Sequence, residues 1–273
     1  MDGYIFDYRL GYIRDDCKYE GFDLIGAEDA LECRIVTLGG YTTPQQARDG
    51  RSWVNALHKQ KDRKHQILNG CTDGYSSAQI LTLFIRDVIL FSPKLVLCLS
   101  GFYNTAYKLG LVQNKSDTAF LSTHPFATPG HLHFYREITS RFGLGNDEVY
   151  YGTENHLPAW ELWLRQMMEI KCLCDEFDIE FKSFLQPCVF SGKYRRSERE
   201  NSFLRECYAI TDYEIEKFHA EFQREYAEII ARTNDIDCIT DLSGVFDDHE
   251  TVYTDAYHVR DEFLPVLTEV ISL

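Results

Sequence analysis

Residues 34–60 read "RIVTLGGYTTPQQARDGRSWVNALHKQ", a layout of strand, turn and helix that recurs in parts along the chain. An apolar, β-branched run (35–38) ends in two glycines, and a segment with helical character follows. In parallel α/β sheets, side chains that follow a strand lie where ligands bind. The side chain in this position is Tyr41, and its chemistry is the main question that the sequence raises.

The same pattern recurs along the chain. Each predicted strand is short, rich in Val, Ile, Leu or Phe, and bounded by Gly, Pro or Asn, as in strands covered on both faces. The predicted strands are 34–40, 65–70, 94–101, 180–187 and 236–244, and helical patterns occupy 76–91, 157–174 and 211–230. The alternation predicts an α/β fold: one three-layer α/β/α domain over residues 1–273, with a central five-stranded parallel sheet.

Two segments do not fit this alternation. Residues 1–33 precede the first strand and are interpreted as an N-terminal extension. Residues 105–156 form a long excursion after the third strand, and we expect an insertion or lid over the cleft. His131 and His133 lie two residues apart in it, but without a third ligand they favour packing over a metal site.

The composition limits the possible partners. The 273 residues carry a formal net charge of −15, which argues against nucleic acid and anionic membranes. The N-terminus resembles no signal peptide, and no apolar run is long enough to span a bilayer. Nine cysteines, an odd number, lie mostly in apolar runs, which predicts free thiols in the cytoplasm. The grouping of Cys172, Cys174 and Cys188 lacks paired C-x-x-C spacing, so we expect no metal.

Four motifs follow the predicted strands or precede the last helix. They are "TLGGYTT" (37–43), "NGCTDGYSSAQ" (69–79), "LSGFYN" (99–104) and "DAYH" (255–258). In order and spacing they resemble the blocks of the SGNH (GDSL-type) hydrolase superfamily, and the resemblance spans nearly the whole chain. The opening "FDYRLGYIRDD" (6–16) is similar to the extension of relatives associated with surface polysaccharides. The resemblance implies a flavodoxin-like strand order.

The resemblance also implies a catalytic site that needs no cofactor. His258 matches the general base and Asp255 the acid that orients it, while Gly74 matches the oxyanion glycine. Tyr41 stands at the position of the nucleophilic serine, which is the main departure from the family. The oxyanion asparagine is ambiguous, because Tyr103 occupies its place by count and Asn104 would serve after a one-residue shift.

Three interpretations of Tyr41 remain open. Its phenol is itself a nucleophile, or Thr42, Thr43 or Cys71 replaces it, or the site no longer performs serine-ester chemistry. The resemblance implies a carbohydrate O-acyl (acetyl) esterase or acyltransferase acting on an acylated carbohydrate or similar ester, with an atypical and impaired site.

The alternative is a non-catalytic protein that binds a sugar or a partner in polysaccharide synthesis. In either case the aromatic side chains Tyr75, Phe102 and Tyr103 are expected to contact the ligand. A purely structural interpretation of Asp255 also stays open, in which its carboxylate caps the last helix and His258 is packed beside it.

Overall fold

The computed structural model describes residues 4–5, 13–14, 22–26, 34–41, 46, 49–60, 65–109, 111 and 157–271. The strands in these ranges are β1 (Tyr4–Ile5), β2 (Ile13–Arg14), β3 (Asp23–Ile25), β4 (Arg34–Gly39), β5 (Gln66–Asn69), β6 (Leu95–Ser100), β7 (Glu180–Leu185) and β8 (Ile239–Asp241). The α-helices are α2 (Trp53–Gln60), α3 (Ser77–Leu83), α4 (Phe102–Leu109), α7 (Ala159–Glu176), α8 (Glu198–Tyr208), α9 (Asp212–Thr233) and α10 (Leu264–Val270). Short π- and 3-10 turns are η1 (Phe84–Val88), η2 (Ile89–Phe91) and η4 (Asp261–Phe263).

The central sheet has the order β3-β5-β4-β6-β7-β8. Strands β5, β4, β6, β7 and β8 are mutually parallel. Numbered along the chain, these five strands follow the order 2-1-3-4-5 of flavodoxin-like folds. The predicted α/β class is therefore confirmed. Strand β3 is an addition to the five expected strands, and it pairs antiparallel with β5 at the sheet edge.

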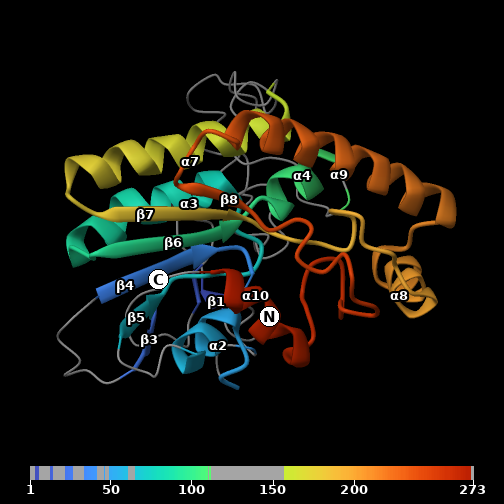
Figure 1. Ribbon diagram of the computed structural model, residues 1–273, viewed down its shortest axis with the longest axis horizontal. Helices are drawn as coiled ribbons and strands as arrows, with labels where there is room; N and C mark the ends of the chain where they lie inside the picture. The colour runs from blue at the N-terminus through green and yellow to red at the C-terminus, as the bar shows by residue number, and fades with distance from the viewer. Residues whose placement is uncertain are drawn as a thin grey trace, which may run out of the picture.

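Helices cover both faces of this sheet, which gives the three layers (Figure 1). Helix α7 packs on α3, α4 and α9 on one face, and α2 packs on α10 on the other. Strand β6, in the middle of the sheet, is buried along its whole length. Strands β5, β4 and β6 are parallel neighbours, so their carboxyl ends lie side by side at one edge of the sheet.

The helix boundaries follow from local chemistry. Helix α9 begins after Thr211, whose hydroxyl accepts a hydrogen bond from the Glu214 amide while the Glu214 carboxylate accepts one from the Thr211 amide. The predicted helix 76–91 is α3 followed by η1 and η2. Within this segment the apolar side chain of Ile85 is 54% exposed, because it lies in the wider π-turn η1.

Strand β3 belongs to the N-terminal extension, so part of that extension completes the sheet. The first residues of the predicted insertion form α4, whereas residues 112–156, with His131 and His133, lie outside the described residues. Within the described part of the chain, none of the helices combines the length and apolar character that a bilayer-spanning helix requires.

Candidate active site

The candidate site is formed by segments that follow three neighbouring strands and by the segment before α10. Tyr41 follows β4, Asp73 and Gly74 lie in the loop after β5, and Tyr103 lies in the first turn of α4, directly after β6. His258 meets them from the segment between β8 and α10. The centres of the Tyr41 and His258 rings are 5.4 Å apart, so residues separated by more than 200 positions are in contact.

Asp255 and His258 form a hydrogen-bonded pair. The Nδ1 atom of His258 lies 2.6 Å from Oδ2 of Asp255. The other carboxylate oxygen, Oδ1, accepts hydrogen bonds from the amides of Tyr257 and His258, at 2.9 and 2.7 Å. Helix α10 begins only at Leu264, so Asp255 closes a local turn and does not cap that helix. The capping alternative is therefore wrong.

His258 is buried and Asp255 is half-buried, and each partner favours the charged form of the other. Burial by itself disfavours the imidazolium of His258, but the charge and hydrogen bond of Asp255, with the charge of Asp73, outweigh it and raise the pKa of His258. Burial likewise opposes ionisation of Asp255, yet His258 and the two amides lower the pKa of that carboxyl. The Nε2 atom of His258 has no hydrogen-bond partner among the described residues and lies 3.8 Å from Oδ1 of Asp73.

Tyr41 is held in the core with its hydroxyl already engaged. The side chain is 2% exposed, and the hydroxyl oxygen accepts a hydrogen bond of 2.8 Å from the Val259 amide. Burial raises the pKa of Tyr41 far above the ordinary value of a phenol. A phenolate, the form that could attack an ester, is therefore strongly disfavoured at this position.

The turn that carries Tyr41 has no room for a side chain at Gly39 or Gly40. Gly39 has a φ of +147°, and a Cβ atom there would lie 2.1 Å from the Leu99 carbonyl oxygen. A Cβ on Gly40 would lie 2.6 Å from Cδ2 of Tyr103. Strands β4 and β6 thus approach closely at their ends, and the Tyr103 ring packs directly over the turn.

Two phenols and a carboxylate form a second network beside the Asp255–His258 pair. The Tyr103 hydroxyl donates to Oδ1 of Asp73 at 2.7 Å, and the Tyr257 hydroxyl donates to the same oxygen at 2.6 Å. The two hydroxyls also contact each other. The ring of Tyr257 stacks on Phe102 with centres 4.6 Å apart. Asp73 and Tyr257 were not assigned a role from the sequence, although each lies inside a motif that was recognised.

The predicted oxyanion residues occupy separate positions. Gly74 has a φ of +86°, a conformation that favours glycine, and its carbonyl accepts a hydrogen bond from the Tyr107 hydroxyl. The side-chain amide of Asn104 donates to the Ser77 hydroxyl at 2.6 Å and its oxygen accepts from the Ser77 amide at 3.1 Å. Asn104 therefore joins α4 to the start of α3, and Tyr103 is the residue that faces Asp73.

The expected ligand-contacting aromatic side chains are packed in the interior. Tyr75 is 2% exposed, Phe102 0% and Tyr103 6%, so none of these rings offers a free face for stacking in this conformation. Cys71, a possible substitute nucleophile, is also fully buried. Thr42 and Thr43 lie outside the described residues.

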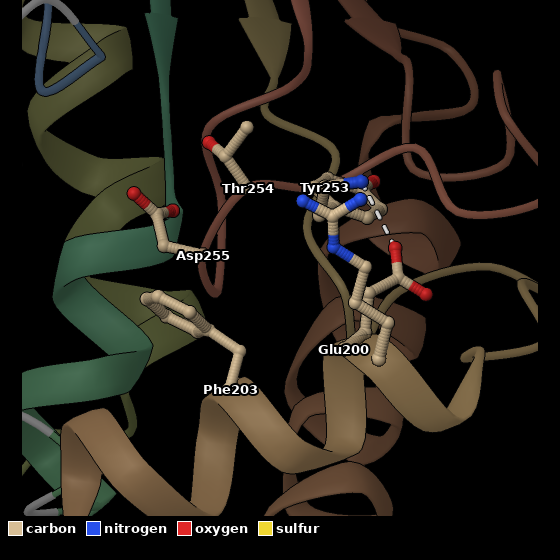
Figure 2. A pocket seen from close by; sticks show the side chains of 6 residues that line it. Glu200, Phe203, Tyr253, Thr254 and Asp255 are labelled. Atoms are coloured by element: carbon tan, nitrogen blue, oxygen red, sulfur yellow. Dashed lines mark hydrogen bonds between the residues drawn. The ribbon is translucent and has the colours of Figure 1, made fainter.

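A small pocket of about 100 Å³ lies between helix α8 and residues 253–255. Figure 2 shows Phe203 of α8 on one side of it with Asp255 and Thr254, and Glu200 hydrogen-bonded to the Tyr253 backbone on the other. Arg199 also lines it. Helix α8 was missed in the sequence, although Ser197 and Glu200 form a capping box that could have revealed its start.

The remaining predictions concern thiols and metals. The cysteines in the described ranges carry free thiols: Cys71, Cys98, Cys172, Cys174, Cys188, Cys207 and Cys238. In those same ranges no three His, Cys, Asp or Glu side chains are grouped so that they could hold a metal ion.

No family model matches the chain, and no curated protein matches it either. Solved structures do resemble it. The acetyl xylan esterase AlAXEase is 11% identical with a TM-score of 0.48, covering 86% of this chain and 96% of that one. A putative GDSL-like lipase from Parabacteroides merdae is 14% identical with a TM-score of 0.47, covering 87% and 92%. A putative acylhydrolase from Bacteroides fragilis is 17% identical with a TM-score of 0.43, covering 90% and 88%.

The structures that resemble this chain are thus GDSL-like lipases, acylhydrolases and acetyl xylan esterases. At these identities the likeness concerns the course of the chain. Any chemistry of this protein rests on its own side chains.

Proposed function

We propose that this chain is a non-hydrolysing protein of SGNH-like fold, which binds a small polar ligand beside its retained Asp255–His258 pair. The observation that carries the proposal is the burial and hydrogen bonding of Tyr41. Its hydroxyl accepts the Val259 amide inside the core, and its ring occupies the place where the resemblance expects a short nucleophilic side chain. A nucleophile must instead reach the substrate at about 3 Å with free lone pairs.

The neighbouring positions support the same proposal. Tyr103 stands where the resemblance expects the oxyanion asparagine, and its hydroxyl is taken up by Asp73. The amide group of Asn104 is engaged by Ser77. An oxyanion hole needs donors that are free to point at the developing charge. Both candidates for the oxyanion asparagine are therefore already engaged in hydrogen bonds within the protein.

The ligand and compartment are parts of this proposal. An acylated carbohydrate or another small polar molecule fits an SGNH-like fold, and polysaccharide synthesis is the setting that the resemblance suggests. The free thiols of Cys71, Cys98 and Cys188, all fully buried, support a reducing compartment such as the cytoplasm.

The test is hydrolysis of p-nitrophenyl acetate by the parent chain. We expect turnover no faster than buffer, and no change in Tyr41→Phe or Cys71→Ala. Clear turnover that depends on His258, measured as its loss in His258→Ala, would overturn the proposal. The two other variants then test Tyr41 and Cys71 as the nucleophile, because removal of the nucleophile abolishes the reaction.

An atypical esterase or acyltransferase is the second candidate, and one observation favours it. The Asp255–His258 pair has the 2.6 Å hydrogen bond of a working base, and Nε2 of His258 has no hydrogen-bond partner among the described residues. On this hypothesis Thr42 or Thr43 supplies the nucleophile. The double variant Thr42→Val/Thr43→Val would then lose an activity that the parent possesses.

A further inference from the structure

We infer that the pocket between helix α8 and residues 253–255 binds a sugar acid, that is, a ring or chain with one carboxylate and several hydroxyls. This inference rests on the proposed binding function and names its ligand class. The pocket is lined by Arg199, Glu200, Phe203, Tyr253, Thr254 and Asp255. Three of these, Arg199, Glu200 and Phe203, come from α8, so the site joins that helix to the segment carrying the Asp–His pair (Figure 2).

Arg199 provides the group that selects a carboxylate. Its side chain is exposed, and it has no ion pair or hydrogen bond within the described ranges. The other arginine of α8, Arg205, is paired with both Glu198 and Asp212. The planar donors of Arg199 match a carboxylate in two-point geometry.

Glu200 does not compete with the ligand for Arg199. Its Oε1 atom accepts from the Tyr194 hydroxyl at 2.6 Å and from the Tyr253 amide at 2.9 Å. Its Oε2 atom accepts from the amide and hydroxyl of Ser197, both at 2.8 Å. The carboxylate is 4% exposed and surrounded by donors, so it forms the wall of the pocket.

Asp255 and Thr254 provide acceptors for hydroxyl groups. The side chain of Asp255 is 24% exposed, so its carboxylate can be reached while it holds His258. The Asp255 carboxylate already accepts hydrogen bonds from two backbone amides and is paired with the His258 ring, so it repels an anion less than an isolated carboxylate would. The Thr254 hydroxyl donates to the His258 carbonyl at 3.1 Å, which leaves its oxygen lone pairs for a ligand hydroxyl.

Phe203 provides an apolar wall, and the size of the pocket limits the ligand. The half-buried Phe203 ring lies on the Asp255 side of the opening (Figure 2). A sugar ring has an apolar face of C–H groups that would cover it, while its hydroxyls point to Asp255. The volume of about 100 Å³ is roughly that of three water molecules in the liquid. The pocket therefore takes one end of the ligand, the carboxylate with its adjacent hydroxyl.

The test is titration of the intact chain with D-glucuronate, D-glucose and acetate by isothermal calorimetry. We expect glucuronate to bind at least about tenfold more tightly than either of the others, because each lacks one class of contact. Arg199→Gln should weaken glucuronate binding by about tenfold or more. Phe203→Leu should weaken glucuronate and glucose alike.

Two control variants, one at an arginine and one at a lysine, test whether the ligand binds in this pocket. Arg195→Gln removes an exposed arginine outside the pocket, and Lys59→Gln removes a cation from a separate pocket between α2 and α10. Both should leave glucuronate binding unchanged. Absence of binding by the parent, equal binding of acetate, or full affinity in Arg199→Gln would each overturn the inference. The ester assay is independent of these results, so failure here and failure of the proposed function are separately visible.

Discussion

The two sides of the candidate site differ in how closely their side chains match the catalytic residues expected from the sequence. On the His258 side, the acid–base pair has a 2.6 Å hydrogen bond and an available Nε2 atom. On the Tyr41 side, the expected short hydroxyl and free amide are replaced by rings whose hydroxyls bond to Val259 and Asp73. One side has the geometry of proton transfer, and the other is part of the hydrophobic core.

The difference shows that the Asp–His pair is held by its own turn and not by the residues on the Tyr41 side. Four hydrogen bonds within the segment 254–258 fix the pair: the two amides on Asp255, the imidazole on Asp255, and the Thr254 amide on the His258 carbonyl. Retention of the pair is therefore a local property of its turn. It is no proof of hydrolysis, and the predictions below separate the two sides.

The largest expected effect is on the Tyr41 side. Tyr41→Ser removes a fully buried ring that packs on His258, and we expect the free energy of unfolding to fall by about 3–5 kcal/mol. Tyr41→Phe keeps the ring and leaves the Val259 amide without its acceptor, at a cost of about 1–3 kcal/mol. Urea denaturation monitored by circular dichroism measures both changes.

Tyr226→Ser is the matched control, because Tyr226 is a buried tyrosine whose hydroxyl also bonds to backbone, at the Gln186 carbonyl. It should lose comparable stability and gain no esterase activity. Tyr41→Ser, where it folds, should show a small His258-dependent gain over the parent. A loss of under about 1 kcal/mol in Tyr41→Ser would contradict the packing described here.

How much of this was visible in the sequence depends on the range of the contacts. The five parallel strands were predictable because each is an apolar run that ends at Gly, Pro or Asn. Strand β3 was not, because its three residues have no clear period and form a strand only by pairing with β5. The same limit applies to Tyr41, whose hydroxyl meets an amide 218 residues away.

The ambiguity between Tyr103 and Asn104 shows a second limit. Both lie in the first turn of α4, where successive side chains point about 100° apart. Only one of them can face the loop after β5, and the choice depends on how α4 sits on β6. The structure turns Tyr103 towards Asp73 and Asn104 towards Ser77. No count along the motif could have decided this.

The second prediction concerns the His258 side. Asp255→Asn removes the nearest negative charge, and we expect the pKa of His258 to fall because burial is then less opposed. A ¹H–¹⁵N NMR titration of the imidazole measures the pKa. An unchanged pKa would show that the pair is not coupled as the geometry indicates.

The sign of the pH dependence follows from the two shifts. The raised pKa of His258 means that its contribution is complete below the ordinary value of 6.5 and is lost as the pH rises through the folded value. The lowered pKa of Asp255 means that its contribution is present above 3.8 and is lost as the pH falls through the folded value. Stability from the pair should therefore be greatest between these limits, and the dependence should flatten in Asp255→Asn.

The smallest expected effect comes from the Asp-to-Asn substitution at Asp73, whose carboxylate lies on the Nε2 side of the His258 ring. Asp73→Asn keeps an oxygen that accepts from Tyr103 and Tyr257, so the network of phenols should survive at a cost of about 1 kcal/mol or less. The charge is lost, but it lies 3.8 Å from Nε2, whereas Asp255 lies 2.6 Å from Nδ1. The pKa of His258 should therefore fall by less than in Asp255→Asn, in the same NMR titration. If Asp73→Asn instead shifted it more, Asp73 would be the principal partner of the imidazole. The two sides of the site would then be one electrostatic unit, and the contrast between a retained pair and a closed nucleophile side would no longer hold.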